Sequence, residues 1–322
     1  MSESSVSQIT ISAEEEGQRL DNFLLKWAKG VPKSHIYRII RSGEVRINKK
    51  RATVTSRIVA GDILRIPPIR IAHREDISQD VQVEYSAKKI SEHMPILFED
   101  SFLLIVNKPS GLAVHGGSGV SLGLIEALRI ARPELKFLEL VHRLDRDTSG
   151  VLMLAKKRSA LTAMHEEMRA GQVDKRYVLV AHGQFLGGRG HVSLQYPLHK
   201  YLLANGERRV KVDDHGQPSL TMIKSMGPSH QDQCFVAEAI LKTGRTHQIR
   251  VHLQHIGHPI LGDDKYGDED LDKKIGVKRL MLHAFRIVFI HPSTKEKMQI
   301  QAPLPEGFAI DSVDTSNPEK AI

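Results

Sequence analysis

The segment HRLDRDTSG occupies residues 142–150 and leads directly into the apolar run VLMLA at 151–155. The apolar run predicts a buried strand, with the polar segment as the loop that enters it. Five ionisable side chains fall within six positions of this loop: His142, Arg143, Asp145, Arg146 and Asp147. Clustered ionisable groups at the mouth of a strand are typical of active sites, and a loop of surface ion pairs is the alternative interpretation.

Asp145 stands between two arginines in this loop. Nearby positive charge favours the charged form of a carboxyl group. A charged carboxylate suits a nucleophile or an electrostatic stabiliser and does not suit a general acid. Asp145 is therefore the first candidate for a catalytic group.

Strands are predicted on both sides of the loop. ILFEDSFLLIVNK at 96–108 indicates two strands across an Asp-Ser turn, and helical patterns occur at 121–131 and 159–170. Further strand patterns follow at 177–181, 233–241, 280–290 and 297–302. Strands outnumber helices and do not alternate strictly with them, so an α+β fold with a mixed sheet is favoured over a doubly wound one.

The N-terminal part of the chain predicts a separate small module. Two helical patterns lie between residues 17 and 41, with Ser34 as a candidate cap of the second helix and Gly43 at its end. A short strand around 45–47 and a strand pair within 57–66 follow. The predicted organisation is a flexible N-terminus at 1–10, this module at 11–70, a polar linker at 71–94, a larger domain at 95–307 and a flexible tail at 308–322.

The positive charge of the chain is concentrated in that module. The whole chain has 46 Lys and Arg against 38 Asp and Glu, a formal net charge of +8. Residues 11–74 hold 14 basic and 6 acidic residues, which is also +8, so the remainder is neutral. A basic module beside a neutral body favours a polyanionic partner, with a well-solvated surface as the alternative. The candidate residues for contact with a polyanion are Arg19, Lys33, Arg38, Arg41, Arg46, Lys49, Lys50 and Arg51.

Composition excludes several classes of protein. With 40% apolar and 26% charged residues, the 322-residue chain has an ordinary globular composition rather than a disordered or collagen-like one. No apolar stretch is long enough for a membrane helix, and no secretory signal opens the chain. A single cysteine, Cys234, excludes an intrachain disulfide and a cysteine-based zinc site. We expect a soluble cytoplasmic protein.

Three further segments carry candidate chemistry. TGRTHQIRVH at 243–252 begins a histidine-rich stretch that suggests zinc, but it lacks the H-E-x-x-H spacing and has no glutamate between its histidines. The glycine-containing NKPSG at 107–111 lacks the order of a phosphate loop or a dinucleotide fingerprint, so a flexible loop beside a cleft is expected. KRY at 175–177 is a candidate base-stacking platform, with simple packing as the alternative.

The loop at 142–150 resembles the signature H-R-L-D-x-x-T-S-G of the RluA-type pseudouridine synthases without a departure. NKPSGLAVH at 107–115, Lys175 with Tyr177, TGRTHQIRVH at 243–252, GHPILGD at 257–263 and RLMLHA at 279–284 resemble the other motifs of that family, in its order. The N-terminal module resembles an S4 RNA-binding domain, from Arg19-Leu20-Asp21-x-Phe23-Leu24 and from SGEVRIN at 42–48.

This resemblance implies a function and a site. The fold would be a largely antiparallel sheet, and the enzyme would isomerise uridines of 23S ribosomal RNA to pseudouridine. It would act as a monomer, without a metal or another cofactor. Asp145 would be the catalytic carboxylate, with Arg250 as the arginine that pairs with it and Tyr177 stacked on the uracil. Arg143 would fill the gap that the extruded base leaves in the RNA. The remaining substrate-binding candidates are His142, Lys175, Arg245, His247 and one of Leu280 and Leu282 as an apolar wall.

Two other classes of function remain as alternatives. A catalytically idle RNA-binding assembly factor of the same fold would require the loss of the carboxylate or of its partner, yet Asp145, Tyr177 and Arg250 are all present. A glycosidase-like hydrolase requires two carboxylates at a defined separation. Asp147 is poorly placed for that role, because it lies two residues from Asp145 on one loop.

Overall fold

The computed structural model describes residues 6–28, 31–69, 81–116, 122–184, 192–229 and 233–308. The chain divides into two compact units, each described here by itself. The first comprises Met1–Lys89 with Ile130–Pro133, and the second comprises Ile90–Arg129 with Glu134–Ile322. The division at residue 89 falls inside the segment expected to be a linker.

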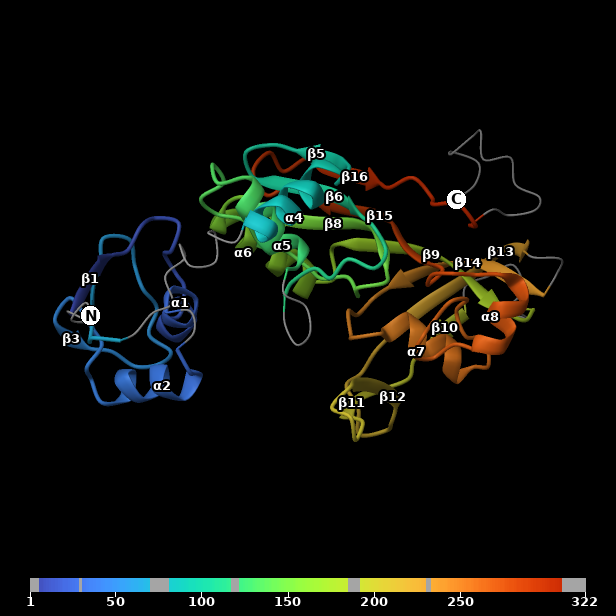
Figure 1. The fold of residues 1–322 in the computed structure, drawn as a ribbon, viewed down its shortest axis with the longest axis horizontal. Coiled ribbons are helices and arrows are strands. Elements are labelled where there is room, and N and C mark those ends of the chain that lie inside the picture. Colours follow the sequence, from blue (N-terminus) through green and yellow to red (C-terminus); the bar gives the residue numbers. More distant parts are fainter. Residues whose placement is uncertain are drawn as a thin grey trace. The chain divides into compact units, whose positions relative to one another are not determined.

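The first unit packs two helices against a small sheet (Figure 1). Helices α1 (Leu20–Trp27) and α2 (Lys33–Arg41) contact each other through apolar residues at helical spacing. The sheet has the order β1 (Ser7–Thr10), β4 (Ile63–Ile66), β2 (Arg46–Ile47) and β3 (Lys50–Arg51). Its core is built mainly from Leu20, Phe23, Leu24, Ile36, Ile39, Ile40, Val45, Ile58, Leu64 and Ile66. The expected helix–helix–strand order is therefore present.

Three local expectations in this unit were wrong. Residues 7–10 are not a flexible end: they form β1, which pairs antiparallel with β4. Only 63–66 of the expected strand pair forms a strand, because β1 and β2 supply the partners of β4. Ser34 does not cap α2, which begins one residue earlier after Pro32, with no side-chain cap. Gly43 does follow the helix, with a φ of 79° that favours glycine.

The segment expected to be a linker contains a helix, α4 (Val81–Glu92). Among the helix residues whose burial is described, Ala87 is the one that is fully buried. A helix with one such contact shows little periodicity in its sequence, and good helix formers such as Glu84, Lys88 and Lys89 stabilise it instead. Linker residues 71–80 lie outside the described residues, as do residues 309–322 of the expected tail. Phe308, where that tail was expected to begin, is buried.

One large sheet organises the second unit (Figure 1). Its strands follow the order β10 (Val192–Leu194), β13 (Thr221–Ser229), β14 (Cys234–Leu241), β9 (Asp174–His182), β15 (Leu282–Ile290), β8 (Ser149–Ala155), β6 (Leu103–Lys108) and β5 (Ile96–Glu99). β16 (Lys297–Gln301) pairs with β15, and β7 (Glu139–Leu140) pairs with β8. Among the described pairs, β8 with β15 is parallel and the others are antiparallel. The expectation of a mixed, largely antiparallel α+β fold is confirmed.

Helices cover both faces of this sheet. Alternate residues of β8 point into two different cores: Leu152 and Leu154 into one, and Val151 and Met153 into the other. α5 (Leu124–Ala131) packs on the first core and α6 (Arg158–Arg169) on the second. This double burial is why VLMLA is continuously apolar rather than alternating.

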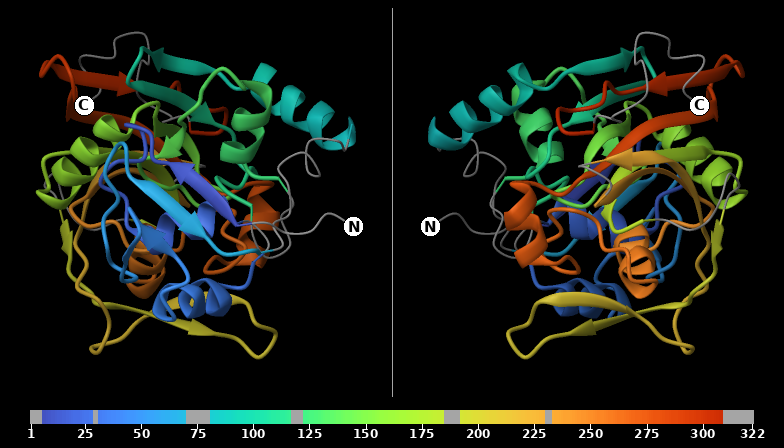
Figure 2. Two further views of the ribbon diagram at one scale, coloured as in Figure 1. Left: turned by 90° about the vertical axis from the view of Figure 1, so that its left-hand side faces the viewer. Right: turned by 90° about the vertical axis from the view of Figure 1, so that its right-hand side faces the viewer.

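Several elements that the sequence did not predict lie beyond β9, and α7 (Gln248–His255) among them contributes residues to the site. α7 and α8 (Glu269–Ile275) pack beside the sheet, and β11 (Leu198–Leu202) pairs with β12 (Arg208–Val212) as a separate hairpin. The hairpin, yellow in Figures 1 and 2, projects away from the sheet past α7. Within the described residues, no helix has the length and apolarity that a membrane span needs.

Candidate active site

A pocket of about 370 Å³ opens beside the loop at 142–150. The lining comes from the loop before β8, from α6, β9, β14 and β15, and from α7 with the segment that enters it. The lining residues include nearly every predicted catalytic and substrate-binding residue: His142, Arg143, Asp145, Lys175, Tyr177, Arg245, His247, Arg250 and Leu282. The structure thus brings residues from four distant motifs into one cavity.

Leu280 is the exception among the candidate residues. It is buried in the core, but it does not line the pocket, whereas Leu282 on β15 does. Residues two positions apart on a strand point to the same face, so the sequence pattern could not choose between Leu280 and Leu282 as the pocket residue. Leu280 lies just before β15 and Leu282 begins it.

Lys108 and Ser110 hold the loop that carries Asp145. The fully buried Lys108 Nζ donates to the carbonyl oxygens of Pro109, Leu112 and Arg146, each at 2.8 Å. Ser110 Oγ donates to the Asp147 carbonyl at 2.6 Å. Burial lowers the pKa of Lys108 to about 7, while its three acceptors match the three protons of an ammonium group. Residues 107–111 are therefore a support for the loop, not the free flexible loop that was expected.

His142 and Gly150 anchor the two ends of the loop. The Met153 amide donates to His142 Nε2 at 3.1 Å, so the imidazole is bound to the backbone of β8. Burial, and then the charge of Lys175, lower the pKa of His142 to about 4. Gly150 has a φ of 109°, and a Cβ there would collide with the backbone of Ala284 in the parallel partner strand. Only glycine fits this close approach.

Asp145 is paired with Arg250 rather than with a neighbour in its own loop. Arg250 Nη1 lies 3.6 Å from Asp145 Oδ2. Arg146, which precedes Asp147, bonds that residue instead, with its Nε 3.1 Å from Asp147 Oδ1. The expectation that adjacent arginines supply the positive charge is thus wrong for Arg146, and α7 supplies the partner.

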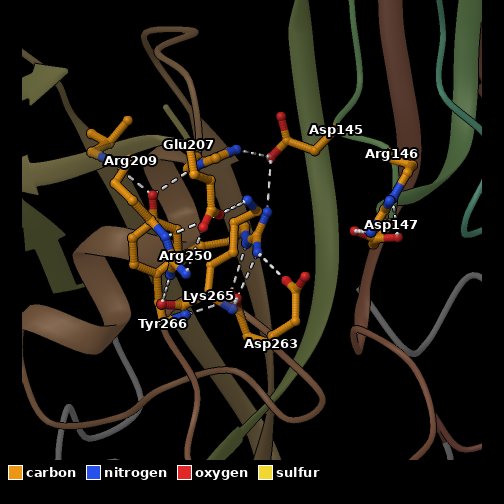
Figure 3. Close-up of polar contacts among 12 residues, drawn as sticks. Asp145, Arg146, Asp147, Glu207, Arg209, Arg250, Asp263, Lys265 and Tyr266 are labelled. Carbon is orange, nitrogen blue, oxygen red and sulfur yellow. Dashed lines mark hydrogen bonds and ion pairs between the residues drawn. The ribbon is translucent and has the colours of Figure 1, made fainter. Parts of the chain in front are cut away.

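Asp263 fixes Arg250 in place. The Arg250 guanidinium is 2% exposed and donates to both oxygens of Asp263, at 2.7 and 2.6 Å. Figure 3 shows the contacts that join Arg250 to Asp145 and to Asp263. Burial opposes the charge of Arg250, but the bonds and charge of Asp263 outweigh it and raise the arginine pKa. Such a two-bond pair sets the guanidinium plane as well as its charge.

His247 is the second group beside Asp145. It precedes α7 with a left-handed φ of 53°, which turns its ring into the pocket. His247 Nε2 lies 3.9 Å from Asp145 Oδ2, and Nδ1 lies 2.7 Å from Tyr266 Oη. Burial is the largest influence on the pKa of His247 and lowers it.

Tyr177 and Lys175 reach the pocket from β9. The phenol ring of Tyr177 is almost fully buried, and burial followed by the charge of Asp145 raises the pKa of its hydroxyl. Burial also lowers the pKa of Lys175. Two residues separated by one position share a strand face, so the Lys-x-Tyr spacing directs both side chains to the same side. Arg245 joins them at the rim, where its Nε donates to the Pro218 carbonyl at 3.2 Å.

The histidines that suggested zinc lie in separate surroundings. His252 Nε2 is within 3.0 Å of Ser219 Oγ and of the Tyr196 carbonyl, and His258 Nδ1 contacts the His182 carbonyl. No group of three metal-binding side chains was found among the described residues.

The basic candidates of the first unit differ in how they are used. Arg19 makes two bonds to the buried Asp21, at 3.0 and 2.8 Å. Arg51 donates to the Arg41 carbonyl at 2.9 Å. Lys49 is exposed in the turn between β2 and β3, and Lys50 is exposed at the start of β3. The remaining candidates are Lys33 near the Tyr37 ring, Arg38 bonded to His35, Arg41 near Tyr37, and Arg46 bonded to two carbonyls.

Residues 102–255 match the family model of RNA pseudouridylate synthases, and residues 18–64 match that of the S4 domain. Ribosomal large subunit pseudouridine synthase C of Yersinia pestis is 52% identical over 93% of this chain and 92% of its own length. The chain belongs to the RNA pseudouridylate synthase family. The synthase C of Escherichia coli K12 is 50% identical over 94% of this chain and 95% of its own length.

Solved structures of the family agree with the fold. Human RNA pseudouridylate synthase domain containing 4 superimposes with a TM-score of 0.56 at 28% identity, over 70% of this chain and 94% of that one. The human domain-containing protein 1 gives a TM-score of 0.55 at 26% identity, over 66% and 84%. This pseudouridine synthase is an isomerase with an S4 domain.

Sequence reasoning missed three groups that support the pocket residues from behind: Lys108, Asp263 and Tyr266. Lys108 lies within the segment 107–115 and Asp263 within 257–263. The sequence around a buried lysine or aspartate does not indicate which distant residues it will bond. Tyr266 lies just beyond the GHPILGD segment.

Proposed function

We propose that the chain isomerises specific uridines of 23S ribosomal RNA to pseudouridine, with Asp145 as the catalytic carboxylate. The observation that carries this proposal is the Asp145–Arg250 pair in a pocket of nucleoside size, since small-molecule sites begin at about 300 Å³. The names of the relatives, which act on the large ribosomal subunit, support the choice of RNA.

The reaction conserves every atom of the uridine. The N1–C1′ bond breaks, the uracil turns, and a C5–C1′ bond forms, after which the proton of C5 leaves and N1 gains one. Asp145 can attack C1′, stabilise an oxocarbenium-like centre there, or remove the 2′ proton. All three routes require a charged carboxylate, and the guanidinium of Arg250 lies 3.6 Å from Asp145 Oδ2.

The base must leave the RNA helix to reach Asp145. Tyr177 would stack on the extruded uracil and Leu282 would close its other side, because both line the pocket. Arg143, exposed in the loop, would fill the space that the base vacates in the RNA. His142 would act indirectly, since its Nε2 is bound to the strand backbone.

The isomerisation transfers no electrons in net terms, so it needs no redox cofactor. We infer an enzyme that works without a metal or cofactor, as a monomer in the cytoplasm. The S4 domain would add sequence-independent phosphate contacts through Lys49, Lys50 and the other basic candidates, which favours a large RNA over a free nucleotide.

The test is Asp145→Asn, which keeps the shape of the side chain and removes its charge. We expect pseudouridine formation in a 23S RNA transcript to fall by at least about 100-fold, with RNA affinity unchanged within about tenfold. The matched control is Asp147→Asn on the same loop, whose side chain faces Arg146 and leaves the Asp145–Arg250 pair intact. Pseudouridine formation by Asp145→Asn at the rate of this control would refute the assignment.

A further inference from the structure

Tyr266 links the β11–β12 hairpin to the active site. The guanidinium carbons of Arg209 and Arg250 lie over its ring, at 5.7 and 5.2 Å from the ring centre. Its amide donates to Asp263 Oδ1 at 3.0 Å, and Asp263 is the carboxylate that holds Arg250. Figure 3 shows Tyr266 beside both arginines.

The hydroxyl of Tyr266 joins two further groups. The Val210 amide of the hairpin donates to Tyr266 Oη at 2.9 Å, which uses the hydroxyl oxygen as an acceptor. His247 Nδ1 lies 2.7 Å from the same oxygen. Burial raises the pKa of Tyr266 to about 12, so the hydroxyl keeps its proton at neutral pH. Of these two contacts, only His247 Nδ1 can accept that proton.

An Nδ1 that accepts a hydrogen bond carries no proton itself. In a neutral imidazole the proton then resides on Nε2. Burial lowers the pKa of His247, which favours the neutral ring. Nε2 lies 3.9 Å from Asp145 Oδ2, too far for a direct hydrogen bond but close enough for the direction of the ring dipole to matter. An Nε2–H attracts the carboxylate, and an Nε2 lone pair repels it.

We propose that Tyr266 is a positioning residue, whose hydroxyl holds His247 in the tautomer that directs Nε2–H toward Asp145. The inference rests on the proposed role of Asp145. The Val210 N–H bond orients the Tyr266 hydroxyl, so the tautomer of His247 also depends on the position of the β11–β12 hairpin beside Tyr266. Two contacts hold the hairpin in that position. Arg209 donates to the Lys265 carbonyl, and the Lys265 side chain forms an ion pair with Glu207 of the hairpin turn.

The first test observes the tautomer without turnover. Long-range proton–nitrogen correlation spectra of the full chain, labelled with ¹⁵N-histidine, distinguish Nε2–H from Nδ1–H rings, and the loss of one signal in His247→Gln assigns His247. We expect Nε2–H in the wild type and a growing share of Nδ1–H in Tyr266→Phe. The wild-type spectrum needs no Tyr266 variant to fold, and an Nδ1–H ring in it would overturn the inference.

The matched control is Tyr196→Phe. Tyr196 packs edge-on against His252 and His255, outside the pocket, and its loss of a hydroxyl should leave the His247 signal unchanged. If Tyr196→Phe shifts the His247 tautomer as much as Tyr266→Phe does, the change reflects a general loss of stability of the second unit. That result would refute the specific role of Tyr266.

The second test measures coupling in the rate. We expect Tyr266→Phe to lower kcat by about tenfold with KM changed less than about threefold, a pattern of lost transition-state stabilisation. In a His247→Gln background the same substitution should cost less than about twofold, because neighbours that act through each other are not additive. An equal cost in both backgrounds would overturn the inference. If Asp145→Asn stays active, the proposed function fails instead, and the tautomer measurement still decides the placement of His247.

Discussion

Arg250 Nη1 lies 3.6 Å from Asp145 Oδ2 while the other nitrogens of the same guanidinium bind Asp263. One arginine therefore joins the loop at 142–150 to the loop after α7. The two carboxylates fix the position of the buried guanidinium and balance its charge. A substitution of Asp263 should therefore affect Asp145 indirectly, by displacing Arg250.

Asp263→Asn should weaken both the fold and the reaction. The amide offers one acceptor atom where Arg250 bonds two, and it does not balance the arginine charge. Breaking a buried pair costs about 3–5 kcal/mol. Denaturant unfolding should report a loss of that order, with kcat reduced in the fraction that remains folded. Asp264→Asn is the control, because Asp264 is exposed and makes one contact at 3.2 Å, so its effect should stay below about 1 kcal/mol. Equal losses in both variants would contradict the special place of Asp263.

Tyr177→Phe should have a small effect on turnover and Tyr177→Ala a large one. Phenylalanine keeps the ring that would stack on the uracil, whereas alanine removes a stack worth about 1–3 kcal/mol per base. Single-turnover assays at a temperature where both variants remain folded would separate the ring from the hydroxyl. Equal losses of turnover in the two variants would show that the hydroxyl, not the ring, is required, and would indicate that Tyr177 transfers a proton.

Replacing Lys49 and Lys50 with alanine should flatten the salt dependence of RNA binding. Each lost phosphate contact lowers the slope of log affinity against log salt by about 0.7–0.9. Titrations of a 23S RNA fragment over a salt series would measure the slopes. Lys273→Ala is the control, since Lys273 on α8 is equally charged but pairs with Glu269. A slope for the double variant that matches the wild type would show that these lysines do not meet phosphate.

Acid should destabilise the second unit through His283. Burial lowers the pKa of this fully buried histidine to about 4, from an ordinary value near 6.5. Between those values the unfolded chain binds a proton that the folded chain does not, so stability is complete above pH 6.5 and falls as the pH is lowered toward 4. The loss from this one group is about 3 kcal/mol at pH 4.

Unfolding measured by denaturant at pH 7 and pH 4, in the wild type and in His283→Asn, would test this. Asparagine does not titrate, so the variant should show a pH dependence smaller by about that amount. The same pH dependence in both proteins would mean that His283 has the same pKa in the folded and the unfolded chain, which would contradict this prediction.

Local patterns in the sequence determined much of this protein. The apolar run at 151–155 predicted the central strand β8, because a strand buried on both faces has no polar alternation. The helices α1, α2, α5 and α6 followed from helical spacing of their apolar residues. The motif resemblance indicated the family before any geometry, since its residues are read directly from the chain.

Other features depended on the tertiary structure. The weakly periodic α4 and the polar hairpin β11–β12 bury too little to leave a strong pattern in the sequence. Leu282, rather than Leu280, lines the pocket, and the buried Lys108 supports the loop from another strand.

The sequence by itself determined which residues carry charge and which segments are apolar, because both are properties of single residues and their near neighbours. Only the tertiary structure decided that Asp145 meets Arg250 and that Tyr266 meets His247. The physical reason is that these contacts join segments far apart in the chain. The contacts depend on the sheet that joins β8, β15 and β9, and on the placement of α7 beside the loop at 142–150.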